Sequence, residues 1–151
     1  MTYVKTATAR AGKPQSRLGE EIDLARAYLD IFRVRMGARL RVSIDVPAHL
    51  ENAVVPSLAI GTLVENAIKH GIGPREAGGN LGISARLAEG RLMVEVRDDG
   101  VGFQARAGHG IGLANIRAQL ATAFEERAVL ELSANPEGGV TASLALPCTF
   151  A

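Results

Sequence analysis

The sequence predicts an α/β fold, a two-layer sandwich in which a mixed five-stranded sheet carries about three helices on one face. Three observations predict this fold. Stretches with apolar residues at helical spacing are separated by short stretches in which apolar and polar residues alternate. Two pairs of the short stretches are joined by turn sequences, as in hairpins. The resulting order is helix, strand, helix, hairpin, helix, hairpin, which is typical of a sheet covered by helices on one side.

Composition excludes several classes of protein. The 151 residues are the usual size of one domain, and 47% of them are hydrophobic, which is enough for a core. The formal net charge is only +1 and basic residues are interleaved with acidic ones, so we expect no nucleic-acid partner. No apolar run has the length of a transmembrane helix, and the N-terminus lacks the apolar core of a signal peptide. We therefore expect a cytoplasmic chain that does not itself insert into a membrane, although it could be the cytoplasmic part of an inner-membrane protein.

The first half of the chain begins without a pattern. Residues 1–16 show no periodicity and are interpreted as a lead-in or the end of an upstream helical segment, followed by one domain over residues 17–151. A helix is predicted over 17–36, with Gly37 at its C-terminal end. Its apolar stripe consists of Leu18, Ile22, Ala25, Leu29 and Phe32.

A strand and a second helix follow. Apolar residues alternate with polar ones over 40–46, which predicts a half-buried strand that ends at Pro47. The second helix is predicted from about Pro56, because proline is favoured in the first turn, and Gly71 is expected just past its end.

The second half predicts two hairpins that flank a third helix. The first hairpin turns at Glu89-Gly90, and the second turns across residues 135–139. The predicted elements are strands 81–88 and 91–97, a glycine-rich loop 98–110, a helix 111–123, and strands 128–133 and 140–146.

The second helix has a narrow polar stripe opposite its apolar side. An acid, a neutral amide and a base lie within two turns, as Glu65, Asn66 and Lys69. On its own this stripe could be an ordinary solvated face with a Glu65–Lys69 ion pair at i,i+4.

An acid and two glycines directly follow the strand 91–97. In Asp98-Asp99-Gly100-Val101-Gly102, an acid can accept a hydrogen bond from an exocyclic amine, and glycines let the backbone approach a flat ligand. Strand alternation predicts that Asp98 points inward and Asp99 points to the other side. The alternative is an ordinary Asp-Gly turn.

A second glycine-rich stretch opens the third helix. Glycines before a helix leave backbone N–H groups free to hold an anion, as in Gly108-His109-Gly110-Ile111-Gly112-Leu113. The spacing is neither that of a dinucleotide-binding fingerprint nor that of a Walker loop.

Taken together, these motifs resemble the GHKL ATPase superfamily, which includes sensor histidine kinases and gyrase. LVENAIKHG at 63–71 is similar to the asparagine box of histidine kinases, DDGVG at 98–102 to the first glycine box, and GHGIGLANI at 108–116 to the second. Residues 18–47 resemble the stretch that precedes the nucleotide site in LytS-type sensor kinases. The resemblance implies the Bergerat/GHKL ATPase fold and the transfer of the γ-phosphoryl group of MgATP to a histidine.

The resemblance also implies roles for single residues. It implies Asn66 as a Mg²⁺ ligand, Glu65 as a general base or polarising group, and Lys69 and His70 at the phosphates. Asp98 would bind the adenine amine, beside Gly100 and Gly102. Residues 103–110 would form a lid over ATP with Phe103 as its apolar hinge. The phosphates would meet the N–H groups of Gly110, Ile111, Gly112 and Leu113, with Asn115 nearby.

Two departures from the family pattern matter. The family has threonine directly after the last glycine pair, whereas here Val140 intervenes and Thr141 is one place on. Either a strand shift presents Thr141 to the adenine or the site loses one hydroxyl.

The second departure is that none of the three histidines, His49, His70 and His109, has the context of a phosphate acceptor. The expected partners are therefore a histidine-bearing dimerisation segment, in cis or in trans, and a response regulator, with a homodimeric full-length kinase. An anti-sigma-type serine kinase and a non-catalytic nucleotide-binding module are the alternatives.

Overall fold

The structure, a computed structural model, describes residues 15–102, 111–124 and 127–151. Within these residues the elements follow the predicted order. The α-helices are α2 (Leu18–Met36), α3 (Ala59–Asn66) and α4 (Ile111–Phe124). The strands of the main sheet are β2 (Leu40–Asp45), β4 (Gly79–Ala88), β5 (Arg91–Asp98), β6 (Val129–Ala134) and β7 (Val140–Pro147). None of the helices in this part of the chain is long and apolar enough to span a membrane.

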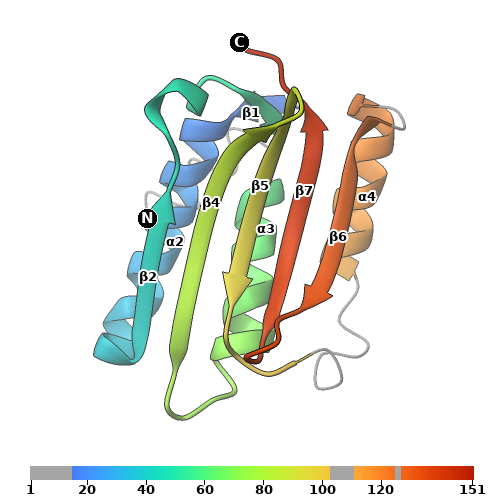
Figure 1. The fold of residues 1–151 in the computed structure, drawn as a ribbon. Helices are drawn as coiled ribbons and strands as arrows, with labels where there is room; N and C mark the ends of the chain where they lie inside the picture. The colour runs from blue at the N-terminus through green and yellow to red at the C-terminus, as the bar shows by residue number, and fades with distance from the viewer. Residues whose placement is uncertain (1–14, 103–110, 125–126) are drawn as a thin grey trace.

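The predicted two-layer sandwich is confirmed. The strands lie in the order β2-β4-β5-β7-β6, and β2 pairs with β4 in parallel while the other neighbours are antiparallel. Figure 1 shows α2, α3 and α4 on one face of the sheet, with the opposite face open. The β4–β5 turn is the expected tight hairpin, because Glu89 and Gly90 both have positive φ, 54° and 77°.

Alternation along β5 leads from the core directly to an acid. Leu92, Val94 and Val96 are buried against the helices. Side chains of a strand point alternately to its two faces, so Asp98 continues this buried row at the end of β5. Its side chain is on the inward side, as predicted, and Asp98 is only 2% exposed.

Helix α3 begins later and ends differently than predicted. Pro56 belongs to a short strand, β3 (Val54–Pro56), and the helix begins at Ala59. The helix does not end before Gly71 but continues as a π-helical segment, Ala67–Ile72. A strand end accepts proline as readily as a first helical turn does, so the residue alone could not decide between them.

A small second sheet was not predicted. Strand β1 (Gln15–Arg17) pairs antiparallel with β3, so the lead-in predicted over 1–16 gives way to structure at Gln15. Strands of three residues are too short for alternation to reveal them. Residues 1–14 lie outside the described residues.

A buried carboxylate connects α2 to the start of α3. Glu21 is 1% exposed, and its Oε1 accepts a hydrogen bond from the backbone N–H of Leu58 at 2.7 Å. Leu58 precedes the first residue of α3 and has a left-handed conformation, φ 66°, which is rare for leucine. A side-chain oxygen at a helix N-terminus satisfies a backbone N–H that has no partner within the helix. Helix α2 therefore fixes where the helix that carries Asn66 begins.

Candidate functional site

Segments far apart in the sequence meet where β5 ends. The carbonyl oxygen of Gly71, in the π-helical segment, accepts a hydrogen bond from the N–H of Val101 at 3.0 Å. On the other side of the same loop, Asn135 Nδ2 donates to the carbonyl oxygen of Asp98 at 2.8 Å. The structure thus brings together two of the three motifs, 63–71 and 98–102, although they lie on different elements.

The polar stripe of α3 lies where the helix changes from α to π geometry. Glu65 and Asn66 are the last residues of α3, and Lys69 and His70 belong to the π-helical segment. Glu65, Asn66 and His70 are half-buried, and Lys69 is exposed. Single π turns within helices occur frequently at functional sites.

Glu65 and Lys69 form the i,i+4 ion pair of the alternative interpretation, an ordinary solvated face. Lys69 Nζ lies 2.8 Å from Glu65 Oε1, and the side chains are 54% and 42% exposed. Such an exposed pair contributes little to stability. Both charges therefore remain accessible to a ligand.

The carboxylate of Asp98 is enclosed by its own loop. Its Oδ1 accepts a hydrogen bond from the backbone N–H of Gly100 at 2.9 Å. A buried carboxylate is costly unless hydrogen-bond donors surround it. The exocyclic amine of a ligand is a donor of the kind that this position favours.

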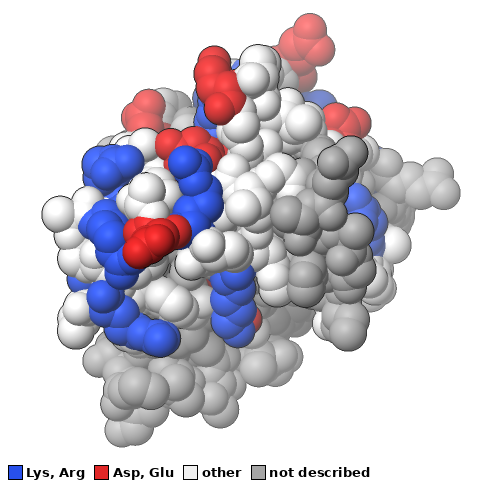
Figure 2. Space-filling view, turned by 90° about the horizontal axis from the view of Figure 1, so that it is seen from below, with Lys and Arg blue, Asp and Glu red and all other residues white. Residues whose placement is uncertain are grey.

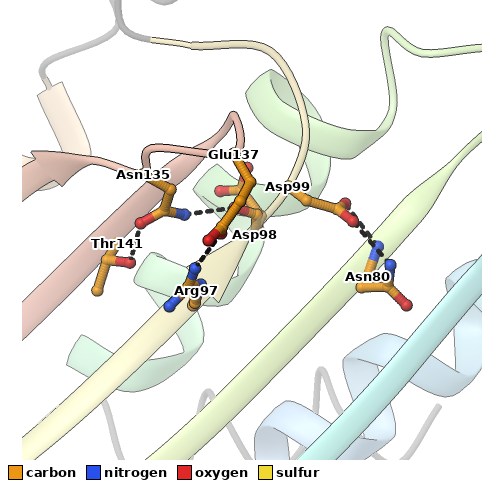
Figure 3. A network of polar contacts seen from close by, with 7 residues as sticks. All are labelled: Asn80, Arg97, Asp98, Asp99, Asn135, Glu137 and Thr141. Carbon is orange, nitrogen blue, oxygen red and sulfur yellow. Dashed lines mark hydrogen bonds and ion pairs between the residues drawn. The ribbon is translucent and has the colours of Figure 1, made fainter.

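Asp99 points to the other side, as predicted, and connects two strands. It accepts hydrogen bonds from the backbone N–H and the side-chain Nδ2 of Asn80, both at 2.7 Å (Figure 3). Desolvation is the largest single influence and raises the pKa of Asp99. It is outweighed by the two Asn80 hydrogen bonds and the positive charge of Arg75, so the pKa lies below its usual 3.8. Asp99 therefore holds the start of β4 against the end of β5.

The two glycines of this loop differ in what surrounds them. A Cβ on Gly100 would lie 2.2 Å from the carbonyl carbon and oxygen of Gly71. A Cβ on Gly102 would have nothing within 4 Å among the described residues. Close packing against the π-helical segment thus explains Gly100 without any ligand, whereas the space beside Gly102 is open.

Thr141 does not share a face with the carboxylate of Asp98. It pairs with Arg97 across β5 and β7, so its side chain lies on the side of the sheet to which Arg97 points. Its hydroxyl donates to Asn135 Oδ1 at 2.6 Å. Val140, 3% exposed, occupies the inward position instead. Of the two readings of this departure from the family pattern, the register favours the loss of a hydroxyl beside the carboxylate.

The third motif is described only in part. Phe103, the lid 103–110 and Gly110 lie outside the described residues. The backbone of Ile111, Gly112 and Leu113 forms the first turn of α4, as predicted, and Asn115 is exposed on the same helix.

A hollow of about 570 Å³ opens beside the acidic loop that begins at Asp98, on the uncovered face of the sheet. Seen from below, basic side chains gather on one side of this end of the molecule, with acidic ones among them (Figure 2). Three arginines line the hollow, and each guanidinium is already bonded to a neighbour: Arg41 to the Asn80 side chain at 2.8 Å, Arg75 to the carbonyl oxygen of Asp99, and Arg97 to Glu137 at 2.7 Å. These arginines therefore brace the ends of the strands.

Near α3 the described residues form no complete set of ligands for a metal ion. In the described part of the chain no three His, Cys, Asp or Glu side chains converge as a metal centre. Asn66 offers an amide oxygen, and no hydrogen bond joins its side chain to another described residue. Mg²⁺ prefers oxygen ligands and commonly takes only one or two from protein.

His49 lies at the other end of the sheet. It is exposed in a 3-10 turn, Ala48–Leu50, that follows β2. Strand β2 runs parallel to β4, so its last residue, Asp45, lies beside Ser84, whereas Asp98 lies beside Leu81 near the other end of β4. His49 therefore lies away from the loop that follows β5.

The residues that support the acidic loop were not predicted from the sequence. Asn80, Arg75 and Asn135 bond to Asp98 or Asp99 from other elements. Asn135 stood in a recognised turn sequence, but nothing in the sequence indicates which strand end a turn approaches.

Comparisons with known proteins agree with this geometry. A family model described as "Histidine kinase-, DNA gyrase B-, and HSP90-like ATPase" matches residues 52–149. The sensor histidine kinase YesM of Bacillus subtilis is 32% identical over 134 residues, which cover 85% of this chain and 23% of that protein. The sensor histidine kinase BtsS of Escherichia coli is 31% identical over 131 residues, which cover 86% of this chain and 23% of that protein.

A solved structure has the same fold. The histidine kinase domain of a blue-light activated histidine kinase from Erythrobacter litoralis superposes with a TM-score of 0.65 at 18% identity, covering 97% of this chain and 71% of that chain. This chain spans less than a quarter of the length of the two sequence relatives, 23% of each.

Proposed function

Because the chain belongs to the histidine kinase-, DNA gyrase B- and HSP90-like ATPase family, we propose that it is the ATP-binding catalytic domain of a two-component sensor histidine kinase. In this role it transfers the γ-phosphoryl group of MgATP to a histidine located outside this chain. One observation carries the proposal. Asp98 is buried at the end of β5, and the loop that follows it is hydrogen-bonded to Gly71. Gly71 lies in the π-helical segment that continues α3, the helix that carries Glu65 and Asn66.

The adenine end of the site is the loop after β5. Asp98 accepts a hydrogen bond from the exocyclic amine of adenine, and guanine has a carbonyl oxygen at that position, which a carboxylate repels. The open space beside Gly102 admits the edge of the base without a side-chain clash. Gly100 serves by packing this loop against the helix.

The phosphate end of the site lies along α3 and the start of α4. Asn66 holds Mg²⁺ through its amide oxygen together with the phosphates, and the ion neutralises negative charge on them. Lys69 and His70 lie one turn on and face the phosphates. The backbone N–H groups of Ile111, Gly112 and Leu113, at the start of α4, add the favourable end of a helix dipole, Gly110 precedes them in the sequence, and Asn115 lies on the same helix.

Glu65 has two functions in this site, one toward the acceptor histidine and one toward Lys69. Its carboxylate polarises the imidazole of the acceptor histidine, and it also orients Lys69 by the 2.8 Å ion pair. Phosphoryl transfer depends on position and charge more than on covalent work by the protein, so the orientation of Lys69 is itself a catalytic contribution.

The partners follow from the missing acceptor. They are a histidine-bearing dimerisation segment, in cis or in trans, and a response regulator that receives the phosphate. The full-length kinase is a homodimer with this domain on the cytoplasmic side. The similarity to YesM and BtsS, both sensor histidine kinases, supports these assignments.

Calorimetric titration with nucleotide and Mg²⁺ tests the adenine assignment. The domain should bind ATP more tightly than GTP, and Asp98→Asn should weaken ATP binding about tenfold or more, because a hydrogen bond to a charged group is lost. Asp99→Asn is the matched control, because the side chain of Asp99 points to the other side of the strand. This variant should bind ATP nearly as the wild type does. Equal affinity for GTP, or equal losses in both variants, would contradict the proposed function.

A further inference from the structure

The turn between β6 and β7 holds the peptide of Asp98 from the neighbouring strand, β7. Asn135, in that turn, is half-buried, and its Nδ2 donates to the carbonyl oxygen of Asp98 at 2.8 Å (Figure 3). The turn also approaches closely through Gly139, which has φ 85°, and a Cβ there would lie 2.1 Å from the same oxygen. The carbonyl of Asp98 is therefore fixed in direction.

Thr141 holds the other end of the Asn135 amide, whose orientation is fixed by the carbonyl of Asp98. Its hydroxyl donates to Asn135 Oδ1 at 2.6 Å, and Thr141 is 8% exposed. An amide whose oxygen accepts on one side presents its NH₂ group to the other. The amide is thus oriented with its donor toward the carbonyl of Asp98, and a flipped amide would place two acceptors against each other.

The same residue, Asp98, is held a second time through its side chain. Its carboxylate Oδ1 accepts from the N–H of Gly100 at 2.9 Å, while the following Val101 N–H bonds to Gly71. Fixing both the carbonyl and the carboxylate of one residue leaves little freedom of rotation. A group that recognises one amine needs placement within about 0.5 Å, which depends on neighbours that are themselves fixed.

From this arrangement we propose that Thr141 and Asn135 are a positioning pair, which aims the carboxylate of Asp98 and thereby sets the preference for a purine with a 6-amino group. Thr141 acts through Asn135 and does not touch the base. The inference rests on the proposed function, since it assigns a specificity-determining role within that nucleotide site. It also gives the displaced threonine a role on the face of the sheet where it lies.

The experiment compares two nucleotides, ATP and purine riboside triphosphate, which lacks only the 6-amino group. Their dissociation constants are measured by calorimetry with Mg²⁺. In Thr141→Val the hydroxyl donor is lost at nearly constant shape, and in Asn135→Asp the NH₂ donor is lost. Each variant should lose ATP affinity about fivefold, the effect expected of one hydrogen bond, with little change for the analogue, so the preference for ATP falls by the same factor.

Two controls separate positioning from general damage. Thr141→Ser keeps the hydroxyl and should restore the preference to the wild-type value. Ser143→Ala removes a hydroxyl that bonds to Glu95 from the same face of β7, and it should leave the preference unchanged. The double variant Asn135→Asp with Thr141→Val should lose no more than one single variant does, because the two residues act in one chain of bonds.

The outcomes distinguish this inference from the proposed function. If the wild type prefers ATP and both Thr141→Val and Asn135→Asp keep that preference, the positioning role alone is overturned. This holds even if the variants have lower melting temperatures. A wild-type domain that binds both nucleotides equally would overturn the adenine assignment of Asp98, and the positioning role with it.

Discussion

The hydrogen bonds around Asp99 should make the stability of the fold depend on pH in the acid range. The folded-state pKa of Asp99 lies below 3.8, so its ionised form stabilises the fold. This contribution is complete above about pH 4 and is lost as the pH falls through the lower folded-state value. In Asp99→Asn, the NH₂ group of the new side chain would face the NH₂ group of Asn80, so two donors would meet. The Asn80 amide cannot flip to relieve this without losing the hydrogen bond that its oxygen accepts from Arg41. The variant should melt about 2–4 °C lower than the wild type at pH 7.

Thermal unfolding from pH 7 to pH 3 checks this prediction. The difference in melting temperature between Asp99→Asn and the wild type should shrink below about pH 4. The control is Asp45→Asn, since Asp45 is exposed at the end of β2 and lies beside Ser84 rather than beside Asn80. A difference that stays constant down to pH 3, or one of equal size in the control, would refute the stabilising role of the ionised Asp99.

Single residues were predictable where only one strand had to be considered. The opposite directions of Asp98 and Asp99 followed from alternation in β5, because that pattern belongs to the strand itself. The reason for Gly100 and the partner of Thr141 depend on a second segment, Gly71 in one case and Asn135 in the other. No pattern along the chain contains such contacts.

At the scale of elements, two glycines test how the acidic loop is attached to α3. Gly100→Ala should destabilise the fold by about 1–3 kcal/mol, because its Cβ would overlap the backbone of Gly71, which cannot move independently. Gly102→Ala is the matched control and should change stability by less than about 0.5 kcal/mol. Urea unfolding of the nucleotide-free domain measures both.

The two variants should also separate packing from binding. If Gly102 lies against the base, Gly102→Ala weakens ATP binding while the free energy of unfolding stays the same. Equal stability of both variants would show that the loop does not pack on the π-helical segment as described.

Long elements were predicted well and short ones were not. The strands β4 and β5 and the helix α2 have enough residues for their periodicity to be decisive. The strands β1 and β3 have three residues each, and their pairing is supported by tertiary contacts, including a backbone hydrogen bond from Leu18 to Ala53 at 2.8 Å. The π-helical segment Ala67–Ile72 has no sequence signal that we recognised.

At the scale of the whole molecule, the sheet register assembles the site. Local patterns predicted a mixed sheet but not its order, in which β7 lies between β5 and β6. That order brings the β6–β7 turn to Asp98, and it follows from pairing between segments about fifty residues apart, such as Glu95 with Ser143. Helix α2 also contributes buried residues to the core, including Leu18 and Leu29.

In the proposed reaction this domain supplies phosphate to a histidine outside this chain. Incubation with γ-labelled ATP and Mg²⁺, with and without a separate histidine-bearing dimerisation segment, tests this transfer. With that segment, acid-labile and base-stable phosphate should form on it, slowly, because the two parts are not tethered. Asn66→Ala should abolish the transfer without unfolding, whereas the control Asn52→Ala, exposed near the other end of the sheet, should not.

The chain alone should stay unlabelled. His49 lies at the far end of the sheet, and His70 is half-buried in the π-helical segment, where we expect it to form part of the wall of the nucleotide site. Label should appear on the added segment only. Stoichiometric phosphohistidine on the isolated chain, or an added segment that stays unlabelled, would contradict the proposed transfer.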